Sequence, residues 1–286
     1  RMRERFAEFK NLPELSNMLS QCFDIVKTSD IEGIRLPEIA GGKPEIVVCE
    51  QSEEQARQVA EGMKRAEMIE NKKVEPEEDN MLAVCSFMTK ASLDPRINNP
   101  EAGDWSGLKV NECVRNIISI HDRYTESAQV VFCDTSTPNK NAGFTVYQEL
   151  KDKLVSTGAF LPDEIAFIHD AQNDMQRIQM FDKVNKGDVK VIIGSTAKLG
   201  TGFNMQQNLI AAHHLDAPYV PKDIEQRNGR IIRQGNVNNE VFIKYYSTKG
   251  TFDSYRWQLL EKKQRLISQV LSGRAPSRKC QDIDET

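Results

Sequence analysis

Residues 189–204 read VKVIIGSTAKLGTGFN, and this stretch decides the fold class. Its first five residues make a short apolar run, rich in β-branched side chains, that is typical of a buried strand. A loop with glycines and hydroxyls follows the run, and a candidate helix at 173–186 precedes it. A buried strand that alternates with helices is typical of the parallel sheets of α/β proteins.

The same alternation extends over residues 107–271. Further candidate strands lie at 129–133, 165–168, 209–215 and 241–246, and further candidate helices at 107–124, 141–157, 221–233 and 251–271. This order predicts right-handed crossovers and a parallel sheet with helices on both faces. Ligands of such folds bind beyond the carboxyl ends of the strands, so we expect the functional residues in those loops.

Residues 1–126 have a different pattern. The spacing of their apolar residues predicts helices at 3–28 and 53–70, an apolar segment covers 81–93, and an acidic connector with a proline lies at 75–79. We therefore expect a mainly helical region at 1–126, an α/β domain at 127–272 and a flexible tail at 273–286.

The composition is that of an ordinary globular protein. Hydrophobic residues make up 39% of the 286 residues, and no apolar run approaches the roughly 20 residues of a membrane span. Because the net charge is −4, a polyanion such as DNA would have to bind a local basic patch. Six scattered cysteines, with no Cys-x-x-Cys pair and no histidine at zinc-like spacing, argue against a metal site and favour a reducing, cytoplasmic setting.

The loop after the 189–193 strand carries groups that are suited to phosphate. Gly200 and Gly202 allow a ligand to approach the backbone closely, and Ser195, Thr196 and Lys198 offer hydrogen-bond donors. The alternative is a turn without a ligand, because turns need glycine in any case.

The loop after the 129–133 strand carries three further hydroxyls, on Thr135, Ser136 and Thr137. Hydroxyls and free backbone amides at the start of a helix form a small anion site. The alternative is a helix N-cap with nothing bound.

Residues 226–235 read QRNGRIIRQG. On a helix, Gln226, Arg230 and Arg233 share one face, because residues at i, i+4 and i+7 lie in one stripe. Guanidinium groups hold phosphate well, and an arginine finger at a nucleotide γ-phosphate is worth roughly 10³–10⁵ in rate. The alternative is a solvated basic helix face.

Two motifs that would hold ATP are absent from the sequence. No Gly-x-x-x-x-Gly-Lys-Ser/Thr loop occurs, and residues 41–43 lack its spacing because a proline follows them. Asp163 and Glu164 precede a candidate strand, whereas an acid that holds Mg²⁺ belongs after one. The arginines are therefore expected to serve a nucleotide that another part of a longer protein holds.

Together these segments resemble the second motor lobe of superfamily-two helicases, most closely the Swi/Snf-like DNA translocases. The resemblance covers about residues 127–272. The matching residues are Val130-Val131-Phe132 with Asp134 (motif four), Ser195-Thr196-x-x-x-Gly200-x-Gly202-x-Asn204 (motif five), Asp216 with Pro221, Gln226-Arg227-x-Gly229-Arg230-x-x-Arg233 (motif six), and Gly250-Thr251-Phe252-Asp253 with Lys262-Lys263 (closing helix). Residues 1–126 resemble, more loosely, the helical region between the lobes of large bacterial mobile-element helicases.

The sequence departs from the family pattern at two places. Ala217-Pro218-Tyr219 stands where the family usually has a tryptophan, and Ile232 stands where many relatives have glycine. Both departures affect the expected DNA contacts of this region and leave the spacing of the arginines unchanged.

The resemblance implies a RecA-like lobe with a role for each candidate site residue. Arg230 and Arg233 would reach the γ-phosphate of ATP, and Gln226 would couple the two lobes. Three residues would lie on the nucleotide side: Gly200, Gly202 and Asn204. Six would contact DNA phosphates: Thr135, Ser136, Thr137, Ser195, Thr196 and Lys198. ATP and Mg²⁺ would be held mainly by the first lobe.

The leading hypothesis is therefore one half of an ATP-driven DNA helicase or translocase, inactive without its P-loop lobe. Its expected partners are that lobe in cis, duplex DNA bound without sequence preference, and a methylase domain that some such proteins carry; no membrane is expected. A second hypothesis is a degenerate lobe that binds DNA or protein without motor function. A third is a stand-alone α/β enzyme for a small phosphorylated substrate, for which the sequence offers no visible nucleophile or general base.

Overall fold

The computed structural model describes residues 8–10, 12–23, 33–139, 143–200, 204–271 and 279–281. The chain divides into two compact units: Arg35–Trp257 forms the larger one, and Arg1–Ile34 with Gln258–Thr286 forms the smaller one. Every candidate site residue belongs to the larger unit.

The smaller unit contains a short antiparallel pair of strands, β1 (Glu8–Lys10) and β9 (Lys279–Gln281), and helix α1 (Leu12–Cys22). The predicted helix at 3–28 is confirmed over α1 only. Residues 8–10 are a strand because they pair with β9, and such pairing overrides local helix propensity. Most other residues of that predicted helix, and of the tail at 273–286, lie outside the described residues.

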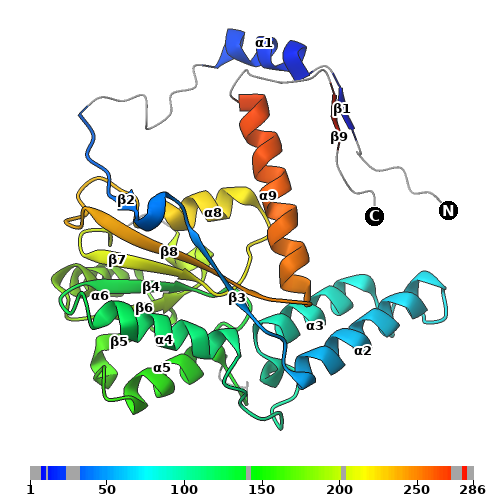
Figure 1. The fold of residues 1–286 in the computed structure, drawn as a ribbon, viewed down its shortest axis with the longest axis horizontal. Coiled ribbons are helices and arrows are strands. Elements are labelled where there is room, and N and C mark those ends of the chain that lie inside the picture. Colours follow the sequence, from blue (N-terminus) through cyan, green and yellow to red (C-terminus); the bar gives the residue numbers. More distant parts are fainter. Residues whose placement is uncertain are drawn as a thin grey trace. The chain divides into compact units, whose positions relative to one another are not determined.

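The larger unit is built on a parallel sheet with the strand order β2-β8-β7-β4-β6-β5, and β3 also pairs with β8 (Figure 1). The strands are β2 (Glu38–Ile39), β3 (Glu45–Cys49), β4 (Ala128–Phe132), β5 (Ile165–Phe167), β6 (Val191–Gly194), β7 (Leu209–His214) and β8 (Glu240–Thr248). Every pairing within this sheet is parallel. The predicted α/β fold is confirmed.

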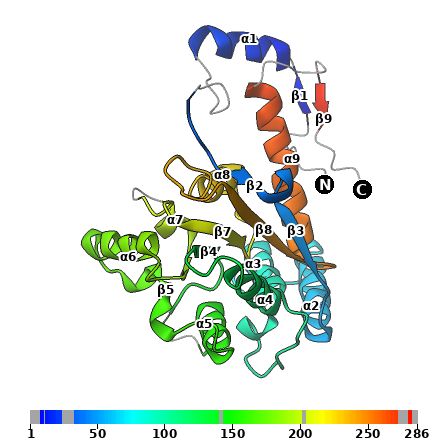
Figure 2. The ribbon, with the colours of Figure 1, turned by 60° about the vertical axis from the view of Figure 1, so that its left-hand side comes forward.

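Helices cover both faces of the sheet. They are α2 (Glu53–Glu70), α3 (Met81–Leu93), α4 (Lys109–His121), α5 (Val146–Ser156), α6 (Asp174–Lys186), α7 (Thr196–Leu199), α8 (Pro221–Asn228) and α9 (Phe252–Leu271), which continues into the smaller unit. One apolar core packs α4 and α5 on the sheet, and a second packs α6 and α7 on the opposite face (Figure 2). No helix within the described residues is long and apolar enough to cross a bilayer.

The region expected to be mainly helical also completes the sheet. Strands β2 and β3 pair one after the other with the outer edge of β8, at Val241 and from Lys244 to Thr248 (Figure 1). The Lys244 ammonium lies 2.5 Å from the Glu45 carboxylate across this pairing. An edge of unpaired backbone groups is thereby covered by a segment that precedes the α/β alternation.

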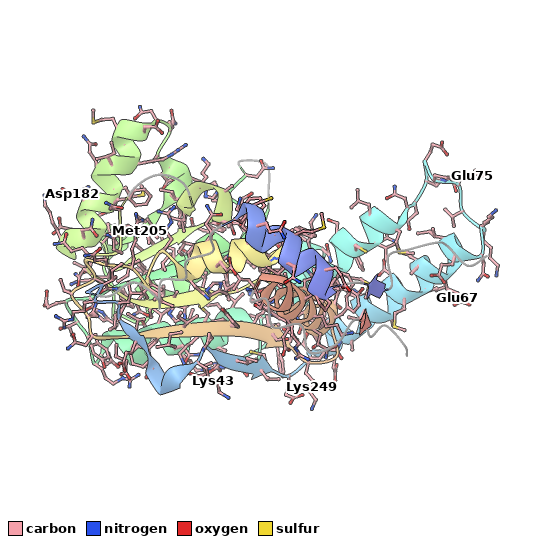
Figure 3. The ribbon with its side chains drawn as sticks, turned by 90° about the horizontal axis from the view of Figure 1, so that it is seen from above. Lys43, Glu67, Glu75, Asp182, Met205 and Lys249 are labelled. Carbon is pink, nitrogen blue, oxygen red and sulfur yellow. The ribbon has the colours of Figure 1, made fainter. Side chains whose placement is uncertain are left out.

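Helices α2 and α3 form a hairpin that extends away from the sheet, with Glu67 and Glu75 toward its far end (Figure 3). Ser52 and Gln55 form a capping box at the start of α2. The buried Gln55 amide donates to carbonyls of residues 91 and 92 in the last turn of α3, and the buried Gln58 amide donates to the carbonyl of residue 95 just after it. The base of the hairpin is therefore fixed by buried hydrogen bonds.

A buried arginine ties this hairpin to the rest of the larger unit. Arg96 follows α3, bonds both oxygens of the Asp94 carboxylate, and reaches Glu149 on α5 at 2.7 Å. Its guanidinium also lies 4.5 Å from the centre of the Phe144 ring. The hairpin thus has a defined position relative to the sheet.

A second ion pair fixes the start of α9. Lys109, at the beginning of α4, pairs with Asp253, and both side chains are almost fully buried. Removing one partner of such a pair leaves an uncompensated charge in the interior. The pair therefore holds the first turn of α9 against α4.

Two adjacent buried histidines lie on β7. The His213 ring bonds the Tyr246 hydroxyl and the Gln129 side chain, and the His214 ring packs edge-on against Tyr245. Burial, with a smaller contribution from Lys244, lowers the pKa of His213 from 6.5 to about 3. Burial also lowers the pKa of His214 well below its ordinary value. Both rings are therefore neutral in the folded protein at neutral pH.

We expect the fold to lose stability as the pH falls below 6.5. The unfolded chain takes up a proton on His213 near that pH, whereas the folded chain does so only near pH 3. The stability advantage of the wild type over His213→Gln should shrink by about 2 kcal/mol between pH 7 and pH 5. Urea unfolding of both chains at the two pH values measures this difference, and an advantage independent of pH would contradict the assignment.

Candidate functional site at the carboxyl end of the sheet

The centre of the candidate site is a fully buried arginine, Arg227 on α8. Its Nε donates to the Thr196 hydroxyl at 2.7 Å, and its Nη1 donates to the Asp216 carbonyl at 2.8 Å. Its Nη2 donates to the carboxylates of Asp134 at 2.7 Å and Asp216 at 3.1 Å. The guanidinium carbon lies 5.4 Å from the centre of the Phe132 ring. One side chain therefore joins α8 to the segments that follow β4, β6 and β7.

The charges of this network compensate one another. Burial alone would lower the pKa of Arg227, but Asp216 and Asp134 raise it above its ordinary value. Arg227 therefore stays charged, and each of its hydrogen bonds to a carboxylate is a strong, charge-assisted one.

The two aspartates also organise the loops that follow the strands. The Asp216 carboxylate accepts from the backbone amides of Asp134 and Thr135 and from the Thr135 hydroxyl, at 2.7–2.8 Å. The Asp134 carboxylate accepts from the backbone amide and the hydroxyl of Thr196, at 2.6 and 2.7 Å. The sequence suggested that the backbone amides of this loop are free to bind an external anion. The amides of residues 134 and 135 are not free, because they donate to the Asp216 carboxylate.

The remaining hydroxyls of these loops differ in exposure. The buried Ser136 hydroxyl accepts from the Val146 amide in the first turn of α5, whose N-cap residue is Thr145. Thr137 is exposed, Ser195 is buried at the N-terminal end of α7, and Lys198 is half-buried. Thr137, and in part Thr135 and Lys198, are thus the predicted phosphate ligands that remain open to solvent.

The prediction that Gln226, Arg230 and Arg233 share one helical face is wrong. Helix α8 ends at Asn228, and the chain continues as a turn from Gly229. Asparagine and glycine are weak helix formers, and the burial of Ile231 in the core next to the sheet favours the turn. Arg233 consequently lies exposed on the turn, whereas Arg230 is folded inward.

Gln226 and Arg230 nevertheless meet, at the carbonyl of Gly200. The Gln226 amide donates to this oxygen at 2.6 Å, and the Arg230 guanidinium donates to the same oxygen. A Cβ atom at position 200 would lie 2.3 Å from the Thr196 carbonyl oxygen and 2.7 Å from the Gln226 amide nitrogen. Position 200 therefore needs glycine because α8 approaches it closely, whether or not a ligand also binds there. We call this arrangement the Gly200 clamp.

Arg230 and Arg233 remain electrostatic neighbours although they do not share a helix. Burial lowers the pKa of Arg230, and the positive charge of Arg233 lowers it further. An anion placed between two like charges would relieve this repulsion. The two arginines can therefore bind an anionic group that approaches from outside the domain.

The predicted nucleotide-side residues are only partly described. Gly200 is buried in the clamp. Asn204 is exposed, and its backbone carbonyl accepts from the Asn185 amide at 3.0 Å. Gly202 lies outside the described residues.

Sequence reasoning gave no separate role to Arg227, the residue that organises the site. Asp134 and Asp216 each follow a predicted strand, and the carboxyl ends of parallel strands lie at the same edge of a sheet. A buried carboxylate, Asp216, beside the partly exposed one of Asp134 requires a cation, and Arg227 is the arginine of the neighbouring helix that points inward. That requirement is the signal that could have identified it.

Comparison with known proteins agrees with this geometry. Residues 109–235 match the family described as helicase conserved C-terminal domain. The matched segment lies within the larger unit and contains Arg227, Arg230 and Arg233.

Two individual proteins are similar to parts of the chain. The chain is 31% identical over 153 residues to the Defense against restriction protein B of Escherichia phage P1, a match that covers 51% of this chain and 7% of the length of that protein. Its fold resembles the crystal structure of the C-terminal part of the Fun30 ATPase domain, with a TM-score of 0.57 and 14% identity. The structural match covers 83% of this chain and 99% of the other, and it shows the shared fold.

We expect Arg227→Met to lower the free energy of unfolding by about 3–5 kcal/mol, because it leaves the buried carboxylate of Asp216, and the partly exposed one of Asp134, without their cation. Arg233→Met, which removes an exposed guanidinium six residues away, is the matched control and should leave stability nearly unchanged. Urea unfolding followed by circular dichroism measures both. Equal losses in the two variants would show that the Arg227 network does not stabilise the fold.

Proposed function

We propose that this chain is the second motor lobe of an ATP-driven, Swi/Snf-like DNA helicase or translocase, and that Arg230 and Arg233 act on the γ-phosphate of ATP. The observation that carries the proposal is the closeness of these two guanidinium groups, whose mutual repulsion an incoming phosphate would relieve. The segment that matches the helicase C-terminal domain family, residues 109–235, includes both arginines. Arginine fingers act in this way because they stabilise the charge that spreads over the transferred phosphoryl group.

ATP and Mg²⁺ would be held mainly by a first, P-loop lobe that belongs to the same longer protein. The residues of this chain would then complete the ATP site when the two lobes close. Arg230 would have to break its hydrogen bond to the Gly200 carbonyl to reach the phosphate. Gln226 would keep its hydrogen bond to that carbonyl and would couple the clamp to the first lobe. Lobe closure would thus be linked to the loss of one of the two hydrogen bonds that the Gly200 carbonyl oxygen accepts.

The loops after β4 and β6 would contact the phosphates of one DNA strand. The exposed Thr137 and the half-buried Thr135 and Lys198 would make direct contacts, and the buried Ser195 would contribute from the N-terminal end of α7. Thr196 and Ser136 would act mainly by holding these loops, because the Thr196 hydroxyl bonds Asp134 and Arg227 and the Ser136 hydroxyl bonds the Val146 amide. Binding of this kind depends on salt and is largely independent of sequence.

We expect Arg230→Ala and Arg233→Ala each to reduce DNA-stimulated ATP hydrolysis by roughly 10³-fold or more in the longer protein that includes the first lobe. Lys222→Ala, which removes an exposed cation from the same helix as Gln226, is the control and should retain activity. The measurement is the rate of phosphate release at saturating ATP and duplex DNA.

Two results would contradict the proposal in different ways. Unchanged ATPase in both arginine variants would refute the finger assignment alone. A longer protein without a P-loop, or one that binds DNA but does not hydrolyse ATP, would favour the alternative of a binding module. The inward position of Arg230 in the Gly200 clamp is the observation that favours that alternative.

A further inference from the structure

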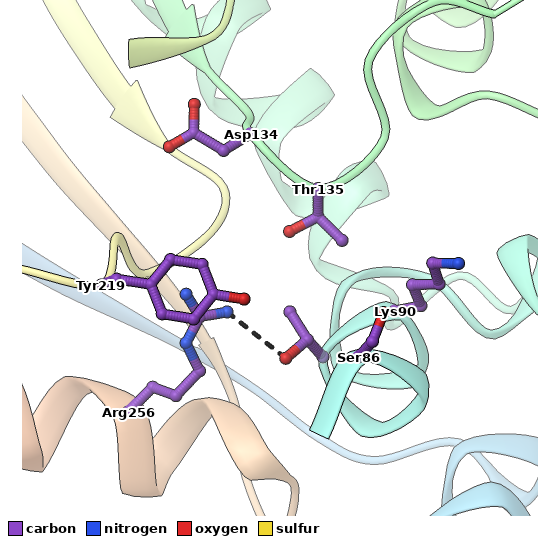
Figure 4. Close-up of a pocket in the computed structure, with 7 residues that line it drawn as sticks. Ser86, Lys90, Asp134, Thr135, Tyr219 and Arg256 are labelled. Atoms are coloured by element: carbon purple, nitrogen blue, oxygen red, sulfur yellow. Dashed lines mark hydrogen bonds between the residues drawn. The ribbon is translucent and has the colours of Figure 1, made fainter. Parts of the chain in front are cut away.

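A small polar cavity opens between helix α3 and the carboxyl end of the sheet. Its volume is about 190 Å³. It is lined by Ser86, Thr89, Lys90, Asp134, Thr135, Tyr219 and Arg256 (Figure 4). Ser86, Thr89, Lys90 and Arg256 all lie outside the segment that matches the helicase family. The cavity therefore combines residues of the resembling segment 127–272 with three residues of α3, Ser86, Thr89 and Lys90, that lie before it.

Arg256 is the most informative residue of this cavity. Only 7% of its surface is exposed. Its guanidinium donates to the Ala217 carbonyl and, at 3.5 Å, to the Thr89 hydroxyl, and it lies 4.6 Å from the centre of the Tyr219 ring (Figure 4). No carboxylate of the described residues lies within ion-pair distance of it, because Asp253, one turn earlier on α9, is paired with Lys109.

This environment leaves a buried cation with no carboxylate in direct contact, although Asp253 interacts with it at longer range. A carbonyl, a hydroxyl and an aromatic face compensate only part of the free energy lost when a guanidinium leaves water. An anion in the cavity would supply the missing charge, and guanidinium groups bind phosphate particularly well.

The other lining groups fit an anion too. Lys90 has no ion pair within the described part of the chain, and the exposed Ser86 and Tyr219 offer hydroxyl donors. Asp134 is the one carboxylate that lines the cavity, and both of its oxygens are already bonded by Thr196 and Arg227. The lining thus carries two cations that lack a carboxylate partner and one carboxylate that has its own.

The hairpin holds this lining in place. Thr89 and Lys90 lie in the last turn of α3, next to the carbonyls of residues 91 and 92 that the buried Gln55 amide bonds. Thr248, at the end of β8, donates to the Ser92 carbonyl at 3.2 Å and so ties this turn to the sheet. The cation positions are therefore set by the fold itself.

We propose that this cavity binds a phosphate group of the nucleic-acid backbone, with Arg256 and Lys90 as its cationic ligands and Ser86 and Tyr219 as hydroxyl donors. Its volume is smaller than the roughly 300 Å³ at which small-molecule pockets begin, which suits one phosphate group better than a whole nucleotide. The inference rests on the proposed function, because it assigns an additional DNA contact to the same motor lobe. It extends the DNA path from the loops after β4 and β6 to the α2–α3 hairpin.

The test is the affinity of the full chain for a fluorescently labelled duplex, measured by anisotropy over a range of salt concentrations. Lys90→Gln should weaken binding equally for duplexes of different sequence and reduce the salt slope by about 1. Lys64→Gln removes the same charge from an exposed position of the hairpin outside the cavity and should change neither. Identical behaviour of the two variants, or a wild type that does not bind duplex DNA at low salt, would overturn the proposal.

A second measurement separates a backbone phosphate from free phosphate. Inorganic phosphate should compete with DNA only weakly and raise the melting temperature of the wild type little beyond chloride at equal ionic strength. Strong stabilisation by phosphate that Arg256→Gln abolishes, without an effect of Lys90→Gln on DNA binding, would assign the cavity to a free anion and overturn the backbone assignment. Failure of the motor proposal is distinct, because it appears as a longer protein that lacks a P-loop or that binds DNA without hydrolysing ATP.

Discussion

The buried guanidinium of Arg227 is the interaction on which the rest of the site depends. It compensates the charges of Asp134 and Asp216, and these two carboxylates in turn bond the amides and hydroxyls of the loops after β4 and β6. Because every polar group of the network has its partner inside the protein, the ends of three strands and helix α8 are coupled as one unit. The turn that carries Arg230 and Arg233 follows directly from the end of that helix.

Much of the fold could be predicted from the sequence, for a physical reason. The strands of a parallel sheet are buried on both faces, so β4, β6 and β7 appear as short apolar runs that are easy to recognise. Strands β2 and β3 were not predicted, because they lie at the edge of the sheet and Ile46 and Val48 remain exposed. The end of α8 was missed because the burial of Ile231, a tertiary contact, decides it.

The site was predictable in its location and less so in its chemistry. The hydroxyls of Thr135 and Thr196 do lie at the carboxyl end of the sheet, as the alternation of strands and helices requires. Their bonds to Asp216 and Asp134 could not be inferred, because the partners are separated by 81 and 62 residues along the chain. The same holds for Lys90 and Arg256, which are brought to one cavity only by the folding of the α2–α3 hairpin onto the sheet.

The central claim is that a phosphate held by another lobe draws Arg230 out of the Gly200 clamp. The most direct test is a structure of the longer protein with a non-hydrolysable ATP analogue and duplex DNA. We expect both the Arg230 and the Arg233 guanidinium groups within hydrogen-bonding distance of the γ-phosphate, with the bonds of Arg227 to Asp134 and Asp216 unchanged. An Arg230 that still bonds the Gly200 carbonyl in the closed complex, with neither arginine at the phosphate, would contradict it.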